Sequence, residues 1–163
     1  MGRTIFIGDV HGCRDELDVL IDKVGLSGGD RLVFVESTRA IEQYFRAADL
    51  YVLPSVREGL SIALLEAMAS GLPCIATRLD GSTDGLIEHD VNGMLVEPDD
   101  AEGFAESIRT ILSDSDRAVR LGCAARETVL ERYSIQRTAP SWLSAYRELA
   151  SASRSDAAVN DPS

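Results

Sequence analysis

Two glutamates, Glu58 and Glu66, stand eight positions apart in a segment that is otherwise almost wholly apolar. Residues 60–70 are predicted to form a helix without a polar face, which is typical of a buried helix. Ionised glutamate is rarely buried without a partner, so chemistry is a reasonable explanation for the pair. Carboxylates accept hydrogen bonds from hydroxyl groups, and eight residues of helix rise about 12 Å. We therefore expect the two side chains to contact the two ends of a hydroxyl-bearing ligand, on the scale of a sugar, a diphosphate and a ribose.

The loop before this helix, REGLS over residues 57–61, has the features of an anion site. It follows an apolar strand and opens a helix, where free N–H groups and the helix dipole favour an anion such as a diphosphate. Gly59 lets the backbone approach a ligand closely. A simpler alternative stays open, in which Glu58 is a favourable charge at a helix N-terminus and Glu66 a polar residue at an exposed edge.

Short apolar segments alternate with helical patterns along the chain. Asp99 or Asp100 can cap a helix over about 101–113, whose inner face would carry Phe104, Ile108 and Ile111. Short apolar strands joined by helices of ten or more residues indicate a parallel sheet with right-handed crossovers. We expect an α/β fold, a Rossmann-like three-layer α-β-α domain with a parallel sheet of about five strands and C-terminal helices. Ligands of such sheets bind at the carboxyl ends of the strands.

The last part of the chain is predicted to be helical and then disordered. A helix within 115–133 would turn Val119, Ala124, Val129 and Leu130 inward, and a further helix follows it. Residues 151–163 lack apolar side chains worth burying, so a disordered tail is expected there. These patterns predict one domain over 1–150 and a tail over 151–163.

Composition excludes several kinds of partner. The formal net charge of −11 disfavours nucleic acid and anionic membranes, because phosphate contacts need clustered Lys and Arg. No segment of the chain has about 18 uninterrupted apolar residues, so no membrane span is expected. The three cysteines are far apart and odd in number, which favours a reduced, cytoplasmic compartment.

The segment from about Ile41 to Tyr146 resembles the C-terminal half of a group 1, GT-B-type retaining glycosyltransferase. The matching stretches are AADLYVLPSVREGLSIALLEAMASGLPCIAT, IEHDVNGMLVEPDD, AEGFAESIRTILSD and RETVLERYS. Within them, EGLSIALLE is the E-x7-E motif of that family in full. The loop over residues 80–84, DGSTD, stands where the family often has Gly-Gly-x-x-Glu, and it departs from that pattern in residue type and length.

The resemblance implies roles for five residues. Glu58 would be the catalytic residue that contacts the transferred sugar, and Gly59, Leu60 and Ser61 would offer backbone N–H groups to sugar or phosphate. Glu66 would hold the ribose hydroxyls of a UDP-type or GDP-type sugar donor. Transfer would proceed with retention and without a metal or cofactor.

The resemblance also sets limits on activity. A complete enzyme of the family has an N-terminal acceptor domain and cations that neutralise the donor diphosphate, and neither is visible in this sequence. We therefore expect an incomplete domain with weak or no activity alone. Two copies could pair through the face that the N-terminal domain would cover.

The first 35 residues carry a second resemblance. Residues 8–12, GDVHG, are similar to the opening motif of calcineurin-like metallophosphoesterases, in which Asp9 and His11 would bind a metal. The remaining ligands of that family are absent, so these two are weak metal candidates and no metal is expected. The same segment also fits the strand, Gly-Asp loop, helix and strand of group 1 glycosyltransferases. A composite joined near Glu36, over 1–35 and 36–150, is one alternative, with no activity of its own; a phosphoesterase remnant is another.

Overall fold

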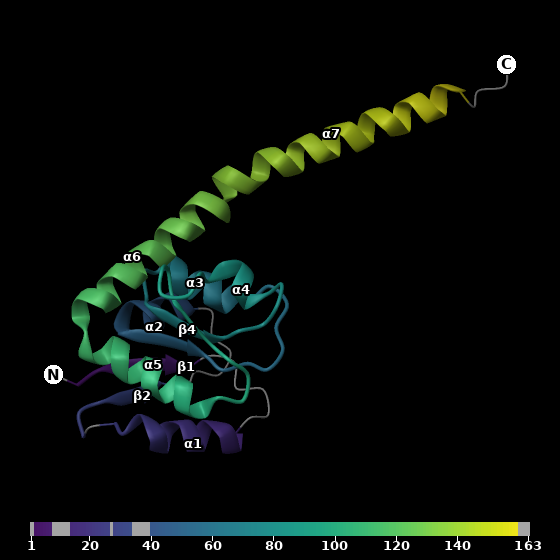
Figure 1. Cartoon of the computed structure of the whole chain (residues 1–163). Coiled ribbons are helices and arrows are strands. Elements are labelled where there is room, and N and C mark those ends of the chain that lie inside the picture. The colour runs from purple at the N-terminus through teal and green to yellow at the C-terminus, as the bar shows by residue number, and fades with distance from the viewer. Residues whose placement is uncertain (1, 8–13, 27, 34–39, 160–163) are drawn as a thin grey trace. The chain divides into compact units, whose positions relative to one another are not determined.

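The structure, a computed structural model, describes residues 2–7, 14–26, 28–33 and 40–159, and within them five parallel strands form one sheet (Figure 1). The strands alternate with helices along the chain, and their order across the sheet is β2-β1-β3-β4-β5. The registers pair Phe6 with Tyr51 and Ile75 with Met94. The predicted fold class is therefore confirmed. The elements of this part are β1 (Thr4–Ile7), α1 (Arg14–Val24), β2 (Arg31–Val33), α2 (Ile41–Ala47), β3 (Leu50–Leu53), α3 (Ile62–Ala69), β4 (Cys74–Thr77), α4 (Thr83–Leu86), β5 (Met94–Val96) and α5 (Ala101–Ser113).

The chain divides into two compact units, Met1–Thr128 and Val129–Ser163, where the sequence predicts one domain over 1–150. Helix α6 (Ser115–Arg132) spans the boundary, and α7 (Ile135–Val159) follows it. Helix α7 extends into the segment for which composition predicts disorder, and no Gly or Pro after Pro140 interrupts it. Among the described residues, no helix combines the length and apolarity that crossing a membrane requires.

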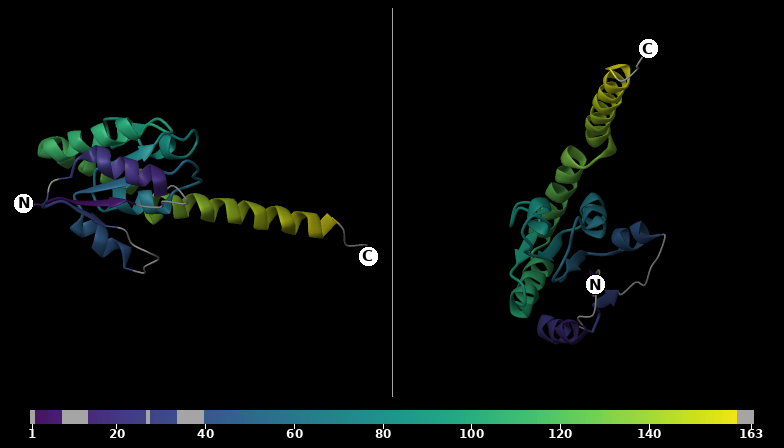
Figure 2. Two further views of the ribbon diagram at one scale, coloured as in Figure 1. Left: turned by 90° about the horizontal axis from the view of Figure 1, so that it is seen from below. Right: turned by 90° about the vertical axis from the view of Figure 1, so that its right-hand side faces the viewer.

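One face of the sheet is covered by α1 and α5, and the other by α2 and α3 (Figures 1 and 2). Because side chains alternate along a strand, each strand supplies both faces. The α1/α5 side forms a mostly aliphatic core from the sheet, these two helices and α6, with Ile5, Val52, Ile75, Ile108 and Leu121 among its members. The α2/α3 side is aromatic, since the rings of Phe6, Phe45 and Tyr51 pack together with centroids 5.2 to 5.8 Å apart.

The inner face of α6 differs in part from the predicted one. Val129 is buried as predicted, but Val119 and Leu130 are 65% and 52% exposed, whereas Leu121 and Ala125 are buried. The physical reason is a close approach of backbones, because a Cβ added to Gly122 would lie 2.1 Å from the carbonyl oxygen of Gly71. A contact through a glycine leaves no hydrophobic signal in the sequence, so the apolar stripe alone misplaced this face.

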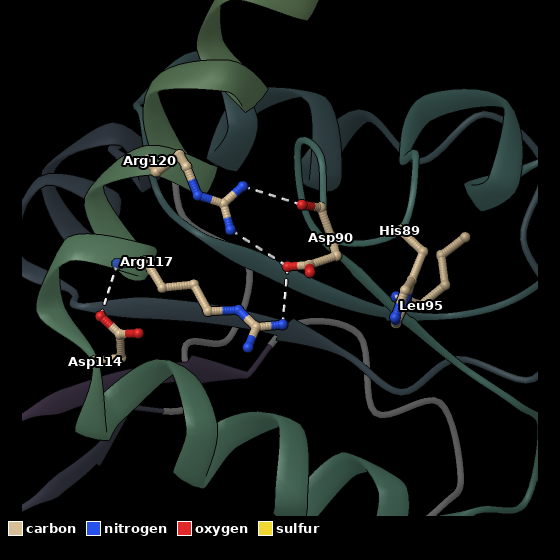
Figure 3. Close-up of polar contacts among 6 residues, drawn as sticks. All are labelled: His89, Asp90, Leu95, Asp114, Arg117 and Arg120. Atoms are coloured by element: carbon tan, nitrogen blue, oxygen red, sulfur yellow. Dashed lines mark hydrogen bonds and ion pairs between the residues drawn. The ribbon is translucent and has the colours of Figure 1, made fainter.

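The turn that leads into β5 is held by the first turns of α6 (Figure 3). Arg117 and Arg120 both donate to Asp90, at 2.8 Å to its carboxylate and 3.1 Å to its backbone oxygen. Asp90 has a left-handed φ of 62°, and these bonds help to hold it there. His89 accepts the N–H of Leu95 at 3.0 Å. The position of β5 at the sheet edge is thus fixed by side chains from two other segments.

Candidate functional site

The loops that follow β3 and β4 lie at the carboxyl ends of these two strands and contact each other. From β1 the chain adds β2 on one side of the sheet and then β3 and the later strands on the other, so the switch point of the topology lies between β1 and β3. Ligands of open α/β sheets bind in the crevice at such a point. The loop after β3, residues 54–61, lies beside that point and carries four of the five predicted site residues: Glu58, Gly59, Leu60 and Ser61. The fifth, Glu66, lies in the helix that the loop opens.

Ser61 starts this helix. It is the N-cap of α3, and its Oγ accepts the N–H of Leu64 at 3.4 Å. Within the part of the chain that the structure describes, the N–H groups of residues 59–63 have no acceptor. A row of consecutive donors at a helix N-terminus is suited to phosphate or sugar oxygens. These N–H groups are therefore free to donate to a ligand, and the anion site stays a prediction.

Glu58 lies next to this row of N–H groups. Its Oε1 atom is buried and has no hydrogen-bond partner among the described residues. Buried polar atoms are normally paired, so an unpaired carboxylate oxygen requires a specific explanation. A ligand hydroxyl donating to Oε1 would satisfy it.

Glu66 lies on the exposed side of α3, as the simpler alternative expects. The helix begins at Ile62 rather than at Leu60, so only the four steps from Ile62 to Glu66 are helical, a rise of about 6 Å. The predicted 12 Å of continuous helix between the two glutamates is therefore wrong. Glu66 stands on the same face as Ile62, one turn above the row of free N–H groups.

The expectation of a helix buried all round is also wrong. Leu64, Ala67 and Met68 are buried, but Ile62 is 58% exposed and Leu60, in the loop, is 60% exposed. These two apolar side chains lie between the two glutamates in sequence. An apolar surface flanked by carboxylates and N–H donors is the usual composition of a ligand site, in which a few polar groups fix orientation.

A second loop, residues 78–82 after β4, contacts the first. The hydroxyl of Ser82 donates to the carbonyl oxygen of Gly59 at 2.5 Å. Arg78, at the start of this loop, forms an ion pair with Glu97 at 2.8 Å. The sequence offered one signal for this loop, the place of residues 80–84 where group 1 glycosyltransferases often have Gly-Gly-x-x-Glu, but nothing that linked it to Gly59.

The other predicted site lies outside the described residues, since Asp9 and His11 fall within 8–13. Among the residues that the structure does describe, no cluster of three or more His, Cys, Asp or Glu side chains could hold a metal ion. The metal candidates therefore stay a sequence-based prediction.

Comparison with known proteins identifies the family of the chain. The family model for glycosyl transferases group 1 matches residues 3–128, which includes the N-terminal strand, helix and strand. A D-inositol 3-phosphate glycosyltransferase of Corynebacterium urealyticum is 29% identical over 82% of this chain and 31% of its own length. A sulfoquinovosyl transferase of Arabidopsis thaliana is 38% identical over 80% of this chain and 25% of its own length. The chain thus spans about a third or less of these relatives.

The solved structures include Anabaena HepE in complex with UDP and glucose. This chain superposes on it with a TM-score of 0.64 and 26% identity, over 86% of this chain and 40% of that one. The family match covers most of the five-stranded unit and includes both loops of the candidate site. The chain belongs to the glycosyl transferases group 1 family.

Proposed function

We propose that residues 58–66 form the donor site of a retaining glycosyltransferase domain, which binds a UDP-type or GDP-type sugar at the carboxyl ends of β3 and β4. The observation that carries this proposal is the buried, unpartnered Oε1 of Glu58. A hydroxyl of the transferred sugar would donate to it. A related solved structure adds support, since HepE forms a complex with UDP and glucose.

Each predicted residue has a role in this proposal. Glu58 is the catalytic residue, in contact with the sugar. The N–H groups of Gly59, Leu60 and Ser61 donate to sugar or diphosphate oxygens, which stabilises negative charge at the start of α3. Glu66 accepts hydrogen bonds from the two ribose hydroxyls of the donor.

Turnover by this chain is expected to be weak. A leaving diphosphate is stabilised by cations, and such stabilisation can be worth roughly several kcal/mol of the barrier. The two described loops carry two arginines, Arg57 and Arg78, and Arg78 is already ion-paired with Glu97. We therefore propose a domain that binds the donor more readily than it transfers the sugar.

Calorimetric titration with UDP, GDP and their glucose conjugates tests this function. Replacing Glu66 with alanine removes charged hydrogen bonds worth about 1.5–3 kcal/mol, so the Kd should rise about 10- to 100-fold. The matched control is Glu127→Ala, which removes an exposed helical carboxylate from α6 and should leave the Kd unchanged. Absence of binding by the parent chain at millimolar ligand would reject the proposal.

A further inference from the structure

The loop after β4 is a rigid turn. The Oγ1 of Thr83, a buried residue, donates to the carbonyl oxygen of Thr77 at 2.5 Å and accepts the N–H of Leu79 at 2.9 Å. The N–H of Ser82 also returns to the carbonyl oxygen of Leu79 at 3.1 Å. Gly81 has a left-handed φ of 71°, which a residue with a side chain adopts only under strain. These bonds fix where the Ser82 side chain begins.

From this turn the hydroxyl of Ser82 reaches the carbonyl oxygen of Gly59, at 2.5 Å. The contact joins two loops that are 23 positions apart in the chain. Glycine imposes little conformational restriction, and a Cβ added to Gly59 would meet no atom within 4 Å. Gly59 therefore has neither a side chain of its own nor close neighbours around its Cα to hold the peptide between Gly59 and Leu60. The hydrogen bond from Ser82 is the described contact that does.

That peptide contains one of the free donors of the candidate site. The carbonyl of Gly59 and the N–H of Leu60 belong to the same planar group, and in a trans peptide they point in opposite directions. The described residues contain no cis peptide. When Ser82 holds the carbonyl on its own side, the N–H of Leu60 must point away from the β4 loop. Rotation of this peptide would turn the N–H in another direction.

We propose that Ser82 is a positioning residue of the donor site: by holding the Gly59 carbonyl, it keeps the N–H of Leu60 directed at the diphosphate-sugar portion of the donor. The inference rests on the proposed function, because it specifies how that site is kept in its binding geometry. Ser82 itself does not touch the donor. Loss of the Ser82 hydroxyl removes no contact with the donor. It adds an entropic cost to binding, because the peptide between Gly59 and Leu60 must then be ordered when the donor binds.

Loss of the Ser82 hydroxyl should weaken binding of ligands that contain the diphosphate and leave binding of the nucleoside alone unchanged. Ser82→Ala should weaken UDP and UDP-glucose about 3- to 10-fold, the size of one neutral hydrogen bond, and leave uridine unchanged. Uridine lacks the diphosphate that the Leu60 N–H would contact but keeps the ribose that Glu66 would hold. Ser82→Thr retains a hydroxyl and should restore most of the affinity. A purely structural role of Ser82 would weaken all three ligands alike.

The matched control is Ser113→Ala on α5, because that hydroxyl also donates to a backbone carbonyl, the one of Thr110 at 3.1 Å. It should change none of the affinities. NMR titration is the measurement, since it also reports the Leu60 amide without ligand, and that signal should move in Ser82→Ala and return in Ser82→Thr. A parent chain that binds neither UDP nor GDP rejects the proposed function and this inference together. A parent that binds, with Ser82→Ala indistinguishable from it, rejects the inference alone.

Discussion

Replacing Glu58 with leucine should stabilise the free protein and weaken donor binding at the same time. The Oε1 atom of Glu58 is buried without a partner in the described structure, and such an atom costs about 1–3 kcal/mol. Because the residue as a whole is partly exposed, we take the lower end, about 1 kcal/mol. Leucine keeps the apolar part of the side chain and removes the oxygen. The Tm of the free protein should therefore rise by about 2–4 °C.

Donor binding should change in the opposite sense. A ligand at 100 times its Kd stabilises the protein by about 2.7 kcal/mol, and a tenfold loss of affinity lowers that to about 1.4 kcal/mol. The ligand-induced rise in Tm should thus be roughly halved in Glu58→Leu. Thermal unfolding with and without UDP-glucose or GDP-glucose measures both effects, with Glu127→Leu as an exposed control. A lower Tm of the free variant, together with an undiminished ligand effect, would refute the reasoning.

Three further predictions concern the framework around the site. Gly122→Ala should lower the free energy of unfolding by about 1–3 kcal/mol in urea titration, because the added Cβ meets a backbone carbonyl at 2.1 Å; an unchanged value would mean that α6 is not packed this closely. The pKa of Glu102 is lowered, first by its hydrogen bond from Lys23 and then by one from an arginine of α5. The contribution of Glu102 to stability is therefore fully present above the pKa that it has in the unfolded chain, and it is lost as the pH falls through the lower pKa of the folded protein. Glu102→Gln should flatten the fall in Tm below about pH 4.5, and an identical acid profile would contradict this. Burial raises the pKa of the Cys74 thiol, so iodoacetamide at pH 8 should label Cys123, which is exposed, and leave Cys74 unlabelled until the protein unfolds.

Local patterns predicted those parts of the fold that depend on neighbouring residues. Helix α5 begins at Ala101 as expected, because Asp100 caps it with a bond of 2.8 Å to the N–H of Gly103. Phe104 and Ile108 are buried as their spacing predicts. The alternation of apolar strands and helices was sufficient for the parallel sheet, because a helix between two strands returns the chain to the end of the sheet where the first strand began. Periodicity and capping are local signals, so a single sequence contains them.

Most of the failures have a different cause. The inner face of α6 depends on Gly122, whose contact is a backbone approach with no side chain to mark it. The start of α3 is the exception, because the N-cap Ser61 is a local signal that the apolar pattern outweighed, and the helix begins at Ile62, two positions after the predicted start. The contact of Ser82 with Gly59 joins two loops, and loop contacts depend on the tertiary structure. The two glutamates were recognisable from sequence, but what holds the peptide beside them was not.

The most direct test of the central claim is a titration of the isotopically labelled chain with UDP-glucose and with GDP-glucose, followed by NMR of the backbone amides. If residues 58–66 bind the donor, the amides of residues 59–63 should show the largest shifts with one of the two ligands, and those shifts should saturate. Amides that stayed unmoved at millimolar concentrations of both ligands, or largest shifts elsewhere in the chain, would contradict donor binding by residues 58–66.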